Sequence, residues 1–276
     1  MKQAAHTQAL ERARALRESL RSCRLCPRQC RVDRLSGYKG FCGLDATVRW
    51  FKEMVYDHEE SGLNPSHQVY FAGCNLRCAF CSVEEWNLQP QEARPLDLGE
   101  LSAVIQRRRE QGAQTLNLLG GEPAVSAHGI LEVLSGLDVR TTVVWNSNMY
   151  YSEPVARALD GLVDVYLADL KVGNPDCAGR LLGAEDYLDV VRANIRQAGA
   201  AGEVIVRHLI LPGHWECCLR PTLEWLAREV PDVKVSLRAN YVPPAGEGPA
   251  PKGYSVMPEQ ERALRIAGEL ALHLVE

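Results

Sequence analysis

From about residue 67 onward, short apolar runs alternate along the chain with longer amphipathic stretches. The short runs are rich in Val, Leu and Ile and are bounded by Gly, Asn or Pro, a pattern typical of buried strands. The longer stretches repeat apolar residues at the spacing of one helix face. We therefore predict strands over residues 68–72, 115–119, 141–145, 163–168, 204–211 and 233–237, and helices over residues 98–111, 127–135, 154–159, 186–198, 221–229 and 258–274.

The alternation of strands and helices predicts an α/β fold with right-handed βαβ units and a parallel sheet. Six such units would form an incomplete (β/α)6 barrel, which we assign to residues 67–276. Residues 1–66 differ in composition, because a predicted helix over residues 6–20 precedes a segment, residues 23–42, that has many Cys and Gly residues. This composition is typical of a loop, so we expect residues 1–66 to form a cysteine-rich extension of the barrel.

Polar residues and glycines directly follow each predicted strand. In parallel barrels and open sheets, the chemistry collects at the carboxyl ends of the strands. We therefore expect the functional site at this end of the sheet. The segments that would meet there are Gly73-Cys74, Gly120-Gly121-Glu122, Asn146-Ser147-Asn148, Asp169-Leu170-Lys171, Pro212-Gly213-His214 and Asn240-Tyr241.

The overall composition narrows the classes of function. The chain has 276 residues, 46% of them hydrophobic, and a formal net charge of -4, which does not favour a nucleic-acid partner. No apolar run approaches the length of a membrane span, and the N-terminus has no apolar core of a signal peptide. We therefore expect a cytoplasmic protein without a membrane partner. In that reducing compartment its ten cysteines are expected to bind metal rather than form disulfides.

Three cysteines, Cys74, Cys78 and Cys81, lie in one short loop with the spacing Cys-x3-Cys-x2-Cys. Iron–sulfur clusters are held by cysteine thiolates. Three thiolates leave one iron of a [4Fe-4S] cluster without a protein ligand, so that iron can bind a small molecule. A zinc site would need a fourth ligand, and Asn75 and Ser82 are poor candidates for that role.

With these cysteines and the aromatic Phe80, the chain resembles the radical S-adenosylmethionine (SAM) superfamily over about residues 68–241. Within the superfamily it is similar to the pyruvate formate-lyase activating enzyme. It is also similar to poorly characterised activating-enzyme-like proteins, because it has a Cys-x2-Cys-Pro-x2-Cys segment at residues 23–30 and a His-Glu-Glu stretch at residues 58–60.

The resemblance implies that SAM binds the open iron and is cleaved reductively to a 5′-deoxyadenosyl radical, which removes hydrogen from a substrate. It also implies an electron donor such as flavodoxin or ferredoxin. The substrate could be a protein glycyl site, as for activating enzymes. One alternative is a small molecule or a ribosomal peptide, and another, of a different class, is a non-catalytic iron–sulfur or zinc scaffold.

The resemblance further assigns cofactor contacts to the residues that follow the strands. Two positions depart from the activating enzymes: Asn146 replaces an aspartate that helps to hold a monovalent cation, and no histidine accompanies Tyr241. His208 alternates with Arg207 along its strand, and we expect it to be a packed structural residue. The cofactor-binding residues implied by the resemblance are Phe80, Gly120, Gly121, Glu122, Asn146, Asn148, Asp169, Lys171 and Arg207.

Four further cysteines, Cys23, Cys26, Cys30 and Cys42, are enough for a closed metal site in the N-terminal extension. Small glycine-rich segments rarely fold without such a site. Structural zinc and an auxiliary [4Fe-4S] cluster fit the spacing equally well, and unliganded cysteines are the remaining alternative.

The last three cysteines, Cys177, Cys217 and Cys218, stand apart from both groups. Neighbouring cysteines rarely bind one metal ion together, so we expect Cys217 and Cys218 to have a structural or incidental role. A catalytic thiol at the mouth of the barrel is the alternative.

Overall fold

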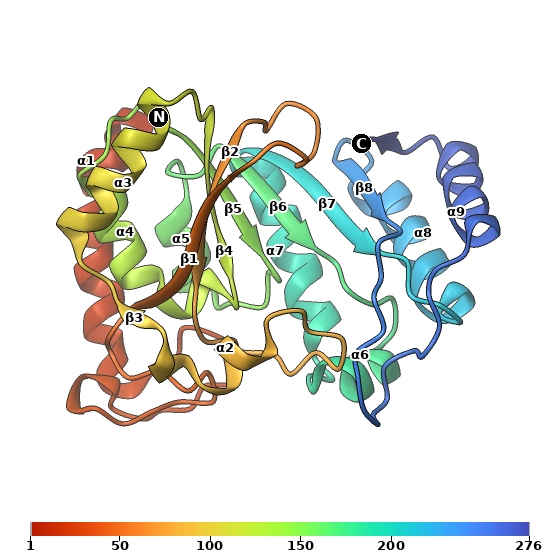
Figure 1. Ribbon diagram of the computed structural model, residues 1–276, viewed down its shortest axis with the longest axis horizontal. Coiled ribbons are helices and arrows are strands. Elements are labelled where there is room, and N and C mark those ends of the chain that lie inside the picture. Colours follow the sequence, from red (N-terminus) through yellow and green to blue (C-terminus); the bar gives the residue numbers. More distant parts are fainter. Residues whose placement is uncertain (1, 276) are drawn as a thin grey trace.

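The computed structural model describes residues 2–275, and one twisted sheet forms its centre, with helices at its edges and along its back (Figure 1). The strand order is β3-β1-β2-β4-β5-β6-β7-β8-β9. The six strands from β2 to β8 in this order are mutually parallel. They are β2 (Ser66–Phe71), β4 (Thr115–Gly120), β5 (Thr142–Ser147), β6 (Val165–Asp169), β7 (Glu203–Leu209) and β8 (Lys234–Arg238).

These six strands confirm the predicted α/β class and the incomplete barrel. Parallel strands are covered on both faces, which explains why their sequences are nearly continuous apolar runs. The helices between them are α3 (Leu98–Glu110), α4 (Ala127–Ser135), α5 (Glu153–Leu159), α6 (Pro175–Leu182), α7 (Tyr187–Ala201) and α8 (Arg220–Glu229). Across the residues that the structure describes, no helix has both the length and the apolar character that crossing a bilayer requires.

The edges of the sheet differ from the prediction. Strand β1 (Arg49–Tyr56) was not predicted and pairs antiparallel with β2, while the short strands β3 (Arg94–Pro95) and β9 (His273–Leu274) end the sheet. The prediction of a helix through residue 274 is wrong, because α9 (Met257–Glu269) ends earlier. Ala271 takes a left-handed conformation with φ 53°, which directs the chain out of the helix and into β9.

The N-terminal helix α1 (Lys2–Glu18) packs against α4 through a stripe of small buried residues, Ala5, Ala9 and Ala13. The cysteine-rich segment follows it as loops and short 3₁₀ turns, including Arg34–Ser36. A boundary at residue 66 stays a prediction, since β1 from the N-terminal side belongs to the same sheet as β2. Further short helices are Ser19–Ser22, α2 (Glu84–Leu88), Pro90–Glu92, Pro123–Ser126 and the π-helical turn Trp215–Leu219.

Candidate active site

A cavity of about 790 Å³ opens inside the curve of the sheet, toward the carboxyl ends of the parallel strands. This volume is within the usual range for a cofactor or small-ligand site. Of the predicted site residues, those that line the cavity are Cys74, Cys78, Phe80, Cys81, Gly120, Gly121, Asn146, Asn148, Asp169, Lys171 and Arg207. The structure therefore gathers residues from five strands at one place.

The loop with Cys74, Cys78 and Cys81, here called the cluster loop (residues 73–82), is held by main-chain hydrogen bonds. Arg77 N donates to Leu182 O at 2.9 Å and Ala79 N donates to Leu181 O at 2.8 Å, so the end of α6 supports the loop. Burial raises the pKa of Cys74, and it raises the pKa of Cys78 to about 12 although the Lys171 ammonium acts in the opposite direction. The raised pKa values mean that Cys74 and Cys78 would become thiolates on binding a metal, which fits a [4Fe-4S] cluster held together with Cys81.

Gly120 and Gly121 end β4 where the chain passes directly beside the cluster loop. A Cβ atom on Gly121 would lie 2.3 Å from Gly73 O and 2.1 Å from Asn87 Oδ1, and one on Gly120 would lie 2.2 Å from Phe71 O. A side chain at Gly121 would therefore push the cluster loop outward, and one at Gly120 would overlap the backbone of β2. Asn87 donates from Nδ2 to Cys81 Sγ at 3.3 Å, so the same contact reaches one of the predicted cluster ligands.

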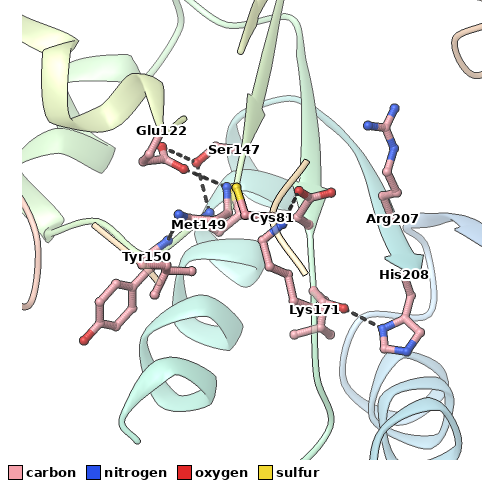
Figure 2. Close-up of polar contacts among 12 residues, drawn as sticks. Cys81, Glu122, Ser147, Met149, Tyr150, Lys171, Arg207 and His208 are labelled. Carbon is pink, nitrogen blue, oxygen red and sulfur yellow. Dashed lines mark hydrogen bonds and ion pairs between the residues drawn. The ribbon is translucent and has the colours of Figure 1, made fainter. Parts of the chain in front are cut away.

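Glu122 is fully buried and does not line the cavity. Its carboxylate accepts hydrogen bonds from Ala124 N at 3.0 Å, Ser147 Oγ at 2.7 Å and Asn148 N at 2.8 Å, as Figure 2 shows for Ser147. Burial raises the pKa of Glu122 to about 7, although these hydrogen bonds act in the opposite direction. The carboxylate therefore fixes the loop after β5 in place, behind the cavity wall.

Asp169 and Lys171 form an ion pair at the end of β6, with Lys171 Nζ 2.6 Å from Asp169 Oδ2. Both side chains face the cavity rather than open solvent, which excludes the alternative of a simple surface salt bridge. Tyr187 supports this corner, because its hydroxyl donates to Asp169 O at 2.7 Å and accepts from Lys171 N at 3.2 Å. The pair places one anionic and one cationic group beside the cluster loop.

Arg207 lies in the wall of the cavity and binds two glutamates of the connection between β1 and β2. Its Nη2 is 2.7 Å from Glu59 Oε2 and 2.7 Å from Glu60 Oε2, and Arg238 is 2.7 Å from Glu60 Oε1. Burial would raise the pKa of Glu60, but Arg207 and Arg238 hold it well below its usual value. Figure 1 shows this connection at the end of the sheet opposite α2, so the acidic pair closes the far end of the barrel.

Arg207 and His208 project to opposite sides of β7 (Figure 2), as the strand alternation predicts. His208 is buried, its Nδ1 lies 2.5 Å from Leu170 O, and burial lowers its pKa to about 4. It is therefore a neutral packing residue, as expected.

Unpaired polar atoms in the cavity wall provide a test of whether the cofactor fits. Asn146 Nδ2 and Asn87 Oδ1 are buried without a hydrogen-bond partner among the described residues. Such groups are costly unless a ligand satisfies them, so the wall is suited to a polar cofactor such as SAM. Phe80 and Tyr241 lie edge to face with ring centroids 6.5 Å apart and provide an apolar part of the same wall.

Sequence reasoning missed the part of the wall that β1 contributes, namely Lys52, Met54 and Tyr56. Arg49–Tyr56 reads RWFKEMVY, in which Lys52 and Glu53 separate two short groups of apolar residues, so the segment has neither the continuous apolar run of a buried strand nor a strict alternation. From the sequence, Glu59 and Glu60 were noted only as part of a family resemblance, and their arginine partners were not predicted.

The N-terminal cysteines lie close to the cluster loop. Arg28 and Arg77 each stack on the ring of Phe41, at 4.1 Å and 4.2 Å from its centroid. Arg28 also donates to Asn75 O at 2.9 Å, so the cysteine-rich segment is attached directly to the loop. These contacts join the two predicted metal centres into one region.

The four N-terminal cysteines are near enough to one another for their thiolates to repel. Burial and this repulsion raise the pKa of Cys26 to about 12. Arg34 is buried and donates to Cys23 Sγ at 3.7 Å. A buried guanidinium needs an anionic partner, and thiolates bound to a metal would supply it. The four cysteines therefore have the character of metal ligands.

The fold and the cavity define the class of protein. The family model of the radical SAM superfamily matches residues 69–226, which is more than half of the 276-residue chain. The chain belongs to the radical SAM superfamily, whose members use a [4Fe-4S] cluster and SAM.

Relatives and solved structures agree with this class. The chain is 32% identical over 268 residues to the uncharacterised protein MJ0674 of Methanocaldococcus jannaschii, covering 92% of this chain and 77% of that protein. It is 31% identical over 119 residues to 7-carboxy-7-deazaguanine synthase of Rhodospirillum rubrum, covering 42% of this chain and 49% of that enzyme. Streptococcus suis SuiB bound to SAM has the same fold, with a TM-score of 0.56, 14% identity, and coverage of 73% of this chain and 47% of that one. The chain thus spans about half the length of the latter two proteins.

Proposed function

We propose that this radical SAM enzyme abstracts hydrogen from a polypeptide, with a protein glycyl site as the substrate. The observation that carries the proposal is the position of the cavity at the open side of the barrel. The sheet ends at β3 and β9 without closing, and the cavity is lined both by Met54 and Tyr56 of β1 and by residues 240–244 after β8. An opening between two sheet edges suits an extended chain better than a fully enclosed pocket does.

The rim of this opening also favours a polypeptide. Val242 lines the cavity and is 68% exposed; Tyr254, on the same connection between β8 and α9, is 66% exposed, and Met257, the first residue of α9, is 70% exposed. Exposed apolar side chains gathered on one segment are typical of interaction surfaces. They support the docking of a protein partner beside the cavity.

Bound SAM supplies the radical that removes the hydrogen atom. The chain's own residues hold and orient the bound groups: Cys74, Cys78 and Cys81 would bind three irons of the cluster. The Asp169–Lys171 pair would offer opposite charges to the amino-acid part of SAM, and Asn146 Nδ2 would offer an unpaired donor. The Glu59–Glu60–Arg207 group excludes water from the far end of the barrel.

The enzymatic part of the proposal is tested by anaerobic reconstitution with iron and sulfide, followed by reduction in the presence of SAM. We expect release of 5′-deoxyadenosine and methionine, and no release from Cys78→Ala, because two thiolates cannot hold the cluster as three do. Absence of 5′-deoxyadenosine from the wild-type protein with a full complement of iron would support the alternative of a non-catalytic scaffold.

The substrate class is tested with a lysate of the source organism, divided by ultrafiltration into macromolecules and small molecules. We expect the macromolecular fraction to stimulate 5′-deoxyadenosine release and to acquire a glycyl-radical signal in electron paramagnetic resonance, and protease treatment to abolish both. The identity to 7-carboxy-7-deazaguanine synthase favours a second candidate, a small-molecule substrate. Stimulation by the small-molecule fraction alone would establish that candidate instead.

We also propose that Cys23, Cys26, Cys30 and Cys42 hold an auxiliary [4Fe-4S] cluster rather than zinc. Among the described residues 2–275, these four sulfur atoms are not all within 4.8 Å of one another. This wider spacing suits a polynuclear cluster better than a single metal ion. The wild-type protein should then bind about eight irons, and Cys23→Ala about four. Loss of zinc with unchanged iron in Cys23→Ala would establish structural zinc instead.

An electron donor such as flavodoxin or ferredoxin is proposed to dock at this N-terminal face. Arg24, Arg31 and Lys39 are exposed around the cysteine-rich segment and give it a positive charge that would attract an acidic partner. Charge reversal at Arg31 and Lys39 should slow cluster reduction by flavodoxin, with dithionite as the control reductant whose rate stays unchanged.

A further inference from the structure

Three cysteines and one histidine converge at a place outside the active-site cavity. Cys177 comes from α6, and His214, Cys217 and Cys218 come from the π-helical turn that precedes α8. Their ligand atoms all lie within 4.8 Å of one another. None of the four lines the active-site cavity, and the group contains no cysteine of either predicted cluster.

The distances within this group match those around a single tetrahedral ion. With Zn–S bonds of about 2.3 Å and a Zn–N bond of about 2.0 Å, two sulfurs lie about 3.8 Å apart and a sulfur and a nitrogen about 3.5 Å apart. In the structure, Cys177 Sγ and Cys217 Sγ are 3.7 Å apart. His214 Nδ1 lies 3.5 Å, 3.3 Å and 3.5 Å from the sulfurs of Cys177, Cys217 and Cys218, respectively.

The local backbone explains how neighbouring cysteines can serve one ion. Residues three and four positions after His214 lie on the same side of a helical turn as His214. Cys218 N donates to His214 O at 3.0 Å, which closes that turn. Neighbouring cysteines rarely bind one metal ion together, but here the spacing of Cys217 and Cys218 to His214, and not to each other, decides where their sulfurs point.

The start of α6 is built to bring Cys177 to this turn. Asn174 accepts from Cys177 N at 2.8 Å and donates to Cys217 O at 2.6 Å, so one amide joins the two segments. A Cβ atom on Gly173 would lie 2.2 Å from Cys218 O, which shows how closely the backbones approach. Such second-layer hydrogen bonds are typical of metal sites, where they orient the ligands.

We propose that Cys177, His214, Cys217 and Cys218 bind one structural zinc ion. Four protein ligands leave no open position, which is the property that separates structural zinc sites from catalytic ones. The group is too narrow for a [4Fe-4S] cluster, because a cube of iron and sulfide holds its cysteines farther apart. In this role the three cysteines would be metal ligands and would not serve as a catalytic thiol.

The zinc ion would connect two loops of the barrel and thereby support the active site. It would join the segment that follows Asp169 of β6 and carries Lys171 to the segment after β7. The other end of α6 accepts hydrogen bonds from the cluster loop through Leu181 O and Leu182 O. A fixed α6 therefore holds the cluster loop in position without touching SAM or the substrate.

The test is metal analysis of the anaerobically purified holoprotein, together with X-ray absorption at the zinc edge. We expect about one zinc per chain, with three sulfurs at about 2.3 Å and one nitrogen at about 2.0 Å. In Cys218→Ser and His214→Ala the zinc content should fall more than tenfold while iron stays bound. Glu216→Gln is the matched control, because Glu216 lies on the same turn but is exposed and outside the group, and its zinc should be unchanged.

Unchanged zinc in both variants would overturn the proposal, as would loss of iron in place of zinc or a Cys177–Cys217 disulfide found by mass spectrometry. If the variants do not accumulate, the absorption spectrum of Cys23→Ala decides, because the N-terminal cysteines cannot then form their site. Four sulfurs around zinc, or no zinc, in that protein would refute the site. None of these measurements depends on SAM cleavage or on the substrate.

Discussion

Gly121→Ala should displace the cluster loop, because the glycine lies in direct contact with it. The added Cβ would be 2.3 Å from Gly73 O, whereas an ordinary contact begins at 3.4 Å. The loop must therefore move by about 1 Å, and such overpacking costs about 1–3 kcal/mol of the free energy of unfolding. Since Gly73 precedes Cys74, the movement passes to the cluster, and a misplacement of about 1 Å can lower the rate about 100-fold.

The assay compares anaerobic urea unfolding, bound iron and the rate of 5′-deoxyadenosine release in the wild type and Gly121→Ala. Gly199→Ala is the matched control, because a Cβ atom at Gly199 in α7 meets nothing within 4 Å. That control should keep its activity and gain up to about 1 kcal/mol, since alanine favours a helix more than glycine does. Wild-type stability and cleavage rate in Gly121→Ala would refute the view that the Gly-Gly pair positions the cluster loop.

Two further predictions concern buried charges. Burial raises the pKa of Glu122 to about 7. The stability that protonated Glu122 contributes is therefore fully present below the unfolded pKa of about 4.5 and is lost as the pH rises through 7, by about 3 kcal/mol in all. Glu122→Gln should flatten the curve of unfolding free energy between pH 5 and 8, and an unchanged slope would contradict this. Arg207→Ala leaves Glu59 and Glu60 buried without that arginine and should lower the free energy of unfolding in urea by about 3–5 kcal/mol. The control Arg220→Ala removes an exposed ion pair and should lower it by less than about 1 kcal/mol. Equal losses of unfolding free energy in the two variants would contradict the role of burial.

The parallel strands could be predicted because each is buried on both faces and is therefore apolar nearly throughout. The same rule failed for β1, which has one partly solvated face, so that Lys52 and Glu53 interrupt its apolar pattern. The edge strand β9 could not be predicted, because only two of its residues, His273 and Leu274, pair with β8. The helix-like pattern of the sequence also extends past the turn that ends α9.

In the site, the spacing of residues along the chain predicted a metal centre only where all of its ligands lie in one short segment. Cys74, Cys78 and Cys81 share one loop, so their chemistry could be inferred directly. Cys177 and His214 meet only after α6, α7 and β7 have folded between them, and no local pattern contains that contact. The cofactor role of Glu122 stays a prediction from the resemblance, and its hydrogen bonds to the loop after β5 could not be predicted from the sequence.

The stacking of Arg28 and Arg77 on Phe41 has a consequence for the order in which the protein is assembled. Residues 23–42 leave the ribosome before the cluster loop and need to close only short loops to bring their cysteines together, a step with a small entropic cost. Their final position, however, requires Arg77 of the later cluster loop. The metal centre proposed for residues 23–42 would therefore be loaded on the nascent chain, whereas its final position would be fixed only when the cluster loop folds onto it.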